Sequence, residues 1–280
     1  DESLAASEIK RQAPVMVVLG NPPYSGHSQN KGAWIESLME EYKQSPALKK
    51  PAQAKWLSDD YVKFIRLSQA RIEQTGYGIL AFVTNHSYLD NPTFMDMRRS
   101  LMRTFDDIYL LDLHGNSKKK ETTPDGGKDE NVFDITEGVC INLFVKTPAK
   151  KPKGATAQIH YCDLYGRRQD KYAFLQQQIL DSIPWQTLQP QAPDYFFVPQ
   201  QSDNQTSAEW HKGIELDKLF PVNSVGIVTA KDSVLIAENK KNLLEQVSDY
   251  YGIEADEDYA RKISYRPFDT RWVYFDTDKV

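Results

Sequence analysis

Asn21, Pro22, Pro23 and Tyr24 are the consecutive residues of this chain best suited to do chemistry. The apolar run 15–19 precedes them and predicts a buried strand, so the four residues would form the turn after that strand. Neither proline has a backbone N–H, so the turn is stiff and leaves carbonyl oxygens uncommitted. The Asn21 side-chain oxygen and the Pro22 carbonyl could therefore accept both N–H bonds of an amino group, and Tyr24 offers a ring for stacking.

Two such acceptors would change the reactivity of an amino group on a nucleobase. This amine is a poor nucleophile because its lone pair is delocalised into the ring. Holding both N–H bonds favours a more tetrahedral nitrogen that can attack a methyl donor, through charge stabilisation and positioning. Tyr24 would stack on the base once it is turned out of its helix. The other interpretation is a plain proline-stiffened corner, but the strand before it and the aromatic after it favour the chemical one.

The Asn-Pro-Pro-Tyr segment resembles the catalytic motif of amino-group methyltransferases that use S-adenosylmethionine, chiefly adenine-N6 DNA methyltransferases. The resemblance continues in order through segments 78–85, 87–94, 97–98, 107–116, 131–135 and 138–146. Segment 265–272 is also similar to large restriction–modification polypeptides, in which methyltransferase, recognition domain and nuclease share one chain. Together these segments extend the resemblance over most of residues 12–280.

The resemblance implies a role for each matching residue. Asn21, Pro22, Pro23 and Tyr24 would be catalytic, with Asn21 also beside the cofactor S-adenosylmethionine. A flipped adenine would lie between Tyr24 and Phe133, although Phe133 is also compatible with ordinary core packing. Residues that would contact double-stranded DNA are Lys118, Lys119, Lys120, Arg266 and Arg271, with Arg261 as a further candidate. The other interpretation of these cations is a solvated loop for the lysines and structural ion pairs for the arginines.

The methyl donor needs a glycine-rich turn after a first strand and an acidic residue after a second. Gly76 and Gly78 enter a predicted strand instead of leaving one, and Gly126–Gly127 lies in a polar loop, so neither pair fits this pattern. We therefore expect the chain to be the second half of a methyltransferase domain together with the start of the next domain. Alone it should bind S-adenosylmethionine weakly or not at all, and its partners should include the remaining domains of the parent polypeptide.

Two other functions are compatible with the sequence. One is a non-catalytic module for DNA specificity or interaction, whose catalytic appearance is inherited. The other is a protein-glutamine or RNA methyltransferase, because the same motif suits any planar amide or aniline-like nitrogen. The ordered matches after residue 85 and the long C-terminal continuation disfavour the protein-glutamine or RNA enzyme. The missing cofactor half keeps the non-catalytic module open for this chain.

Composition indicates a globular protein, because 26% of its 280 residues are charged and 40% are hydrophobic. The net charge of −5 argues against strong DNA binding by this chain alone, although a local basic face can still engage phosphates. Lone Cys140 and Cys162 are typical of a reducing cytoplasm. No Cys or His spacing indicates a metal, and no apolar run approaches the ~20 residues that a membrane helix needs.

The predicted fold class is α/β, the C-terminal half of a Rossmann-like methyltransferase sheet with an antiparallel last strand, followed by a smaller α+β unit. Residues 1–183 would be the partial catalytic domain, 184–206 a proline-rich connector, and 207–280 the start of a target-recognition domain. We expect strands at 14–20, 78–84, 107–113, 138–146 and 157–165, with strand 138–146 paired antiparallel to strand 107–113. Helices are expected at 58–76, 93–104, 167–180 and 239–250. In the first of them, Tyr61, Ile65, Ser68 and Ile72 fall on one face at helical spacing and should face inward.

Overall fold

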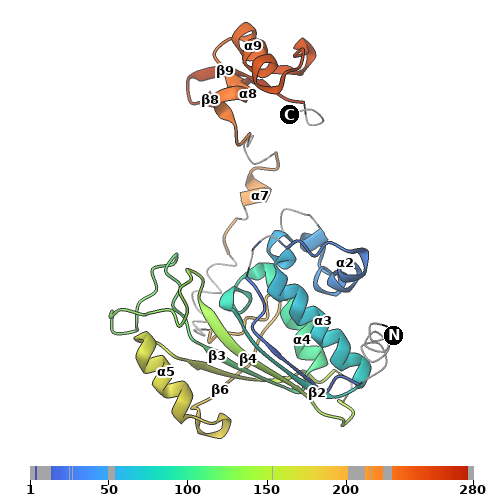
Figure 1. The fold of residues 1–280 in the computed structure, drawn as a ribbon, viewed down its shortest axis with the longest axis vertical. Coiled ribbons are helices and arrows are strands. Elements are labelled where there is room, and N and C mark those ends of the chain that lie inside the picture. Colours follow the sequence, from blue (N-terminus) through green and yellow to red (C-terminus); the bar gives the residue numbers. More distant parts are fainter. Residues whose placement is uncertain are drawn as a thin grey trace. The chain divides into compact units, whose positions relative to one another are not determined.

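The computed structural model describes residues 4, 14–24, 26, 28–49, 54–152, 154–200, 212–214, 216–222 and 229–276. The chain divides into two compact units, Asp1–Ser202 and Asp203–Val280. The first unit holds a mixed sheet with helices on both of its faces (Figure 1). The second holds a small antiparallel sheet with one long helix. The mixed α/β architecture is compatible with the expected Rossmann-like class.

The sheet of the first unit has six strands in the order β1-β2-β4-β3-β5-β6. Their bounds are Val17–Gly20, Gly78–Asn85, Val139–Lys146, Asp107–Asp112, Gln158–Asp163 and Gln186–Leu188 in that order. β1, β2, β3 and β5 run parallel to one another, while β4 and β6 run antiparallel to their neighbours. The prediction that strand 138–146 pairs antiparallel with strand 107–113 is confirmed, and β4 lies between β2 and β3.

Helices α3 (Asp60–Thr75) and α4 (Met95–Thr104) pack on one face of this sheet, and α5 (Arg168–Gln177) packs on the other. The predicted inward face of α3 is confirmed, because Tyr61, Ile65, Ser68 and Ile72 are all buried. Gly76 ends this helix in the left-handed region, at φ 91°, where glycine has no steric penalty. Shorter α2 (Ala33–Met39) precedes α3 in the chain.

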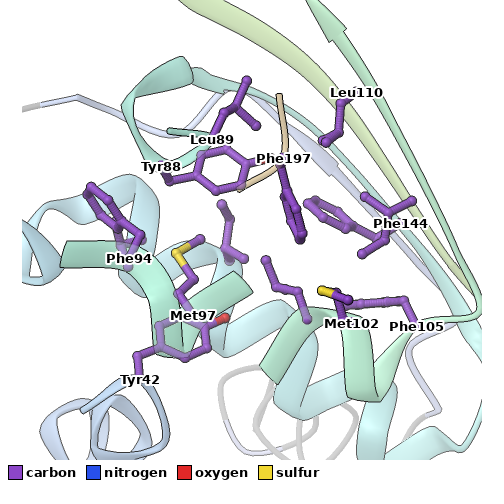
Figure 2. Close-up of a cluster of buried hydrophobic side chains, with 14 of the residues drawn as sticks. Tyr42, Tyr88, Leu89, Phe94, Met97, Met102, Phe105, Leu110, Phe144 and Phe197 are labelled. Carbon is purple, nitrogen blue, oxygen red and sulfur yellow. The ribbon is translucent and has the colours of Figure 1, made fainter. Parts of the chain in front are cut away.

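The first unit has two clusters of buried hydrophobic side chains, one on each face of the sheet. The larger core cluster fills the space between the sheet and helices α3 and α4. Figure 2 shows aromatic side chains from several elements meeting there, among them Tyr88, Phe94, Phe105, Phe144 and Phe197. All five are nearly inaccessible to solvent. Close packing of this kind fixes the sheet edge that carries the polar residues of the candidate site.

The apolar run before Asn21 forms a strand, β1, as expected. The expectation that this strand is buried is wrong. β1 pairs only with β2 among the described strands, with Val17 opposite Ile79 and Gly20 opposite Phe82. The side chains of Val17 and Leu19 are 62% and 79% exposed, because no described element covers them. Val18, on the other face, packs against the larger core cluster.

The proline-rich stretch, expected to be a connector, contributes to the first unit as far as residue 200. β6 lies inside it and pairs with β5, with Leu188 opposite Ile159. Phe197 is fully buried, and its backbone N–H donates to the carbonyl of Leu89 over 2.8 Å. Arg98, also fully buried, donates from Nε and Nη2 to the carbonyl of Asp194 at 2.9 and 2.7 Å. These contacts fasten 186–198 to α4 and the sheet.

The second unit contains the sheet β7-β9-β8, with bounds Ile236–Ala237, Asp269–Tyr274 and Ala260–Arg266. Its helices are α7 (Leu216–Leu219), α8 (Asp232–Leu235) and α9 (Lys240–Tyr251). Leu243 and Val247 of α9 pack against Ala260 and Tyr274 to form a small core of its own. Within the expected target-recognition domain, 207–280, residues 207–211, 215, 223–228 and 277–280 lie outside the described residues.

Candidate functional site

Asn21 to Tyr24 lie directly after β1, at the edge of the sheet where the parallel strands end. Asn21 is exposed and Pro22 is buried. The Tyr24 hydroxyl lies 2.8 Å from Oδ1 of Asn21 and 2.9 Å from the carbonyl oxygen of Val83. A phenol has one proton, so it can donate to only one of these oxygens at a time. The Asn21 amide oxygen therefore retains capacity to accept a hydrogen bond from an incoming group.

Partial burial governs the chemistry of the Tyr24 phenol. Desolvation raises the pKa of Tyr24 above its ordinary value, with a smaller contribution from Cys140. The hydroxyl therefore stays protonated at neutral pH and stays a donor. The ring packs edge-on against Tyr61, with centroids 6.2 Å apart. The hydroxyl of Tyr24 is thus held by hydrogen bonds and its ring by packing on Tyr61, while part of the side chain faces a cavity.

The cavity beside Tyr24 has a volume of about 500 Å³. Trp56, which is 50% exposed, contributes a second large aromatic side chain to its wall. Polar groups from the ends of several strands complete the lining: Asn85 at the end of β2, Ser87 just after it, Asn116 after β3, and Glu137 before β4. An aromatic wall with convergent amide and hydroxyl groups suits a flat polar ring.

Local hydrogen bonds hold the polar lining in place. Oδ1 of Asn85 accepts from the backbone N–H and the hydroxyl of Ser87 at 2.8 and 2.7 Å. Oδ1 of Asn116 accepts from the backbone N–H of Lys119 at 3.0 Å. Asparagine side chains that cap turns in this way are fixed by the backbone that they bind. The lining is therefore largely ordered without a ligand.

Phe133 does not reach the cavity of Tyr24. It packs with Leu111, Leu113 and Val139, a cluster on the α5 face of the sheet, whereas Tyr24 packs with the cluster on the α3 and α4 face. Phe133 lines a separate cavity of about 870 Å³ together with Asp129, Asn131 and Arg168. Side chains that alternate along the strands keep these two clusters apart. Tyr24 and Phe133 consequently do not face each other across one space.

The predicted lysine cluster contributes two of its three members to the cavity of Tyr24. Lys118 and Lys119 line it, while Lys120 is exposed in the same turn, with a φ of 52°. Lys118 forms an ion pair with Glu137, and Lys119 lies 3.3 Å from Asp90. Both pairs are well exposed, so both ammonium groups can exchange these partners at small cost.

The candidate arginines lie in the second unit. Arg271 is bound to Asp269, with Nη2 3.0 Å from Oδ2, which matches the alternative of a structural ion pair. Its guanidinium also lies 4.5 Å from the ring centre of Tyr265, and that of Arg266 lies 5.4 Å from it. Arg261 donates to the carbonyl of Ala260. These residues form a basic, aromatic group around the hairpin of β8 and β9.

Sequence reasoning missed Trp56, Asn85 and Asn116. Asn85 and Asn116 follow predicted strands that run in one direction, so their meeting at one edge could have been inferred. Trp56 comes from a short 3₁₀ helix, Lys55–Ser58, whose sequence has no periodic signal that would place it.

No family model matches the sequence, and no curated protein matches it. Solved structures do share its fold. The chain is similar to DrdV in a complex with DNA, with 22% identity, a TM-score of 0.69 and coverage of 99% of this chain and 32% of that one. It is also similar to a nuclease-deletion mutant of the Type ISP restriction–modification enzyme LlaGI with a DNA substrate mimic. There the identity is 20%, the TM-score 0.65, and the coverage 98% and 31%.

A further similar structure is the ATP-dependent Type ISP restriction–modification enzyme LlaBIII bound to DNA. The identity is 21% and the TM-score 0.66, over 99% of this chain and 21% of that one. The chain thus spans a third or less of the length of these neighbours, and it has the fold of one segment of them. None of the helices in the described part of the chain has the length and apolar character that a membrane crossing requires.

Proposed function

We propose that this chain is part of a restriction–modification enzyme and transfers a methyl group from S-adenosylmethionine to the N6 amine of a flipped adenine in double-stranded DNA. In this proposal Asn21 Oδ1 and the Pro22 carbonyl accept the two N–H bonds of the amine. Nitrogen becomes more nucleophilic as it turns tetrahedral, and the acceptors stabilise the positive charge that develops on it. No strong general base is needed, since the proton leaves after the methyl group has been transferred.

The observation that supports this proposal most is the position of the Asn-Pro-Pro-Tyr turn. It follows a parallel strand at the carboxyl edge of an α/β sheet, where such folds bind their ligands. Asn21 is exposed there, and Tyr24 faces an aromatic cavity of about 500 Å³. That volume suits one nucleobase with part of its sugar.

We assign the second aromatic contact of the base to Trp56 in preference to Phe133. Trp56 shares the cavity of Tyr24, and Phe133 lies in the other one. Stacking on an aromatic ring is worth about 1–3 kcal/mol per base, which offsets much of the few kcal/mol that extrusion costs. Lys118 and Lys119, at the rim of the same cavity, are the proposed phosphate contacts.

The proposal places the methyl donor on the β1 side of Asn21. The exposed side chains of Val17 and Leu19 offer an apolar surface there. The remaining domains of a parent polypeptide would supply the donor pocket, which agrees with the small share of the similar enzymes that this chain spans.

Methyl transfer from tritiated S-adenosylmethionine to duplex DNA tests the proposal in the full polypeptide. Asn21→Ala should lower kcat by about 10²–10³-fold, the usual effect of removing one group that stabilises transition-state charge. Gln176→Ala, which removes an exposed amide from α5, is the matched control and should be neutral.

Analysis of the labelled product then separates the candidate functions. Label recovered as N6-methyladenine supports the proposal. Label found only in RNA or on protein glutamine would replace it with the other methyltransferase functions. DNA binding without any transfer would favour the non-catalytic module.

A further inference from the structure

A second group of reactive side chains lies beside the cavity of Tyr24. His86 follows β2, His114 follows β3, and Glu121 lies in the loop between β3 and β4. One nitrogen of each ring and one oxygen of the carboxylate lie within 4.8 Å of one another. Both histidines are buried. Together with Asp112 and Asp163 they line a cavity of about 300 Å³.

The distances inside this group are too long for hydrogen bonds. Oε1 of Glu121 lies 4.0 Å from Nε2 of His86 and 3.9 Å from Nδ1 of His114. Oδ2 of Asp112 lies 3.7 Å from the same Nδ1. Ligand atoms around a tetrahedral zinc ion, with bonds of about 2.0–2.2 Å, lie about 3.4 Å apart. Small side-chain rotations would close the gap around such an ion.

The outer nitrogen of each imidazole is already bound to a carboxylate. Nδ1 of His86 lies 3.0 Å from Oδ1 of Asp112, and Nε2 of His114 lies 2.6 Å from Oδ1 of Asp163. The side-chain amide nitrogen of Asn116, which can only donate, lies 3.3 Å from Nε2 of His86, so the His86 proton is on Nδ1. A metal ion on Nε2 would take the place of this long hydrogen bond. Both inward nitrogens can then carry a lone pair. This carboxylate–histidine arrangement is the one that orients zinc ligands in proteins.

Packing holds both rings in place. A Cβ at Gly138 would lie 2.2 Å from Nε2 of His86, so glycine is required for the backbone to lie against that imidazole. Tyr165 stacks on His114, with centroids 3.8 Å apart. The rings are therefore positioned before any ligand arrives, which lowers the cost of assembling a site.

The charges of this group of side chains favour binding of a cation. Three carboxylates lie around the two buried imidazoles: Asp112 is buried, Glu121 is half-buried and Asp163 is exposed. Asp90 and Lys119 line the same cavity and pair with each other at 3.3 Å, so the three carboxylates stay in excess.

We propose that His86 Nε2, His114 Nδ1 and Glu121 Oε1 bind one Zn²⁺ ion. Two imidazoles with a carboxylate oxygen form a donor set that zinc prefers over magnesium or calcium. The ion ties the ends of β2 and β3 to the loop that carries Lys118 and Lys119. It would thus fix the rim of the cavity of Tyr24.

Zinc binding by the untagged full chain tests this proposal. Isothermal titration with zinc chloride should give one ion per chain, with a Kd in the micromolar range or lower. Glu121→Gln should abolish this binding, because its amide can donate to the imidazole lone pairs in place of the ion. His160→Ala is the matched control, since His160 also pairs with an aspartate, Asp107, at 3.0 Å but has no third ligand among the described residues. It should bind zinc like the wild type.

A measurement on the wild type covers the case in which a variant fails to fold. Imidazole ¹⁵N spectra with and without zinc should show shifts of the His86 and His114 nitrogens and none for His160. Asp163→Asn, which removes the carboxylate that orients the His114 ring, should weaken binding about 10–100-fold. Absence of zinc binding by the wild type, equal binding by Glu121→Gln, or zinc shifts confined to other histidines would each overturn the proposal.

Discussion

Replacing Lys171 by Met should destabilise the first unit more than any other single ion-pair change in its described part. The side chains of Lys171 and Asp129 are both 0% exposed. The ammonium donates to Asp129 Oδ1 at 2.8 Å and to the carbonyls of Leu113 and Glu130 at 2.7 Å each. This one group therefore joins α5, the end of β3 and the loop before β4.

The loss of unfolding free energy depends on the buried groups that Lys171→Met leaves without a partner. Removing one partner of a buried ion pair costs about 3–5 kcal/mol, because the other charge stays buried without compensation. Asp129 would keep two backbone donors, the N–H groups of Gly115 at 2.6 Å and Gly166 at 2.8 Å. These donors favour the lower part of that range, about 3 kcal/mol. Against a typical stability of about 5–15 kcal/mol this is a large loss.

Urea denaturation is the assay, with the second unit as an internal reference. In Lys171→Met the urea concentration at the unfolding midpoint of the first unit should fall, and that of the second unit should not change. Lys128→Met is the matched control, because Lys128 pairs with Glu130 at 2.7 Å in the same loop but is 78% exposed, so it should leave the midpoint unchanged. Asp129→Asn should cost less in the Lys171→Met background than in the wild type. A loss below about 1 kcal/mol for Lys171→Met would refute the reasoning that rests on burial.

Three further predictions concern the site and the pH dependence of the fold. Tyr24→Phe should bind DNA with a target adenine as tightly as the wild type, whereas Tyr24→Ala should bind about 5–150-fold more weakly, the equivalent of about 1–3 kcal/mol of stacking, by fluorescence anisotropy. Trp56→Ala should weaken the same binding in that range, and unchanged binding would exclude its ring from the base site. Burial would raise the pKa of Asp106, but hydrogen bonds from the N–H and hydroxyl of Thr147, both 2.7 Å, outweigh it and lower that pKa. The ionised carboxylate therefore stabilises the fold above its unfolded pKa, and this contribution is lost as the pH falls through the folded value, so Thr147→Val should move acid unfolding to higher pH.

Local patterns in the sequence predicted most of the first unit. Residues 60–75 have one apolar face and end at a glycine, and both features depend on nearby residues alone. The strand at 139–146 and its antiparallel pairing with 107–112 also followed from the sequence. Such features depend on periodicity and on turn residues, which a single chain displays directly.

Burial and long-range contacts could not be predicted in the same way. The apolar composition of β1 indicated burial, but exposure depends on which element covers a strand, and the described residues leave Val17 and Leu19 open. Phe133 is an aromatic beside a strand, and the face on which it packs depends on the alternation along β3 and β4. His86, His114 and Glu121 come from separate segments, with no short spacing that would indicate a metal.

The position of the target base in a complex of the full polypeptide with DNA and a non-reactive analogue of S-adenosylmethionine tests the central claim most directly. The account predicts an adenine turned out of the duplex, with its N6 atom at hydrogen-bond distance, about 2.7–3.2 Å, from Asn21 Oδ1 and the Pro22 carbonyl, and its ring against Tyr24. An adenine that stays stacked in the helix, or that enters the cavity of Phe133 with Asn21 uninvolved, would contradict it.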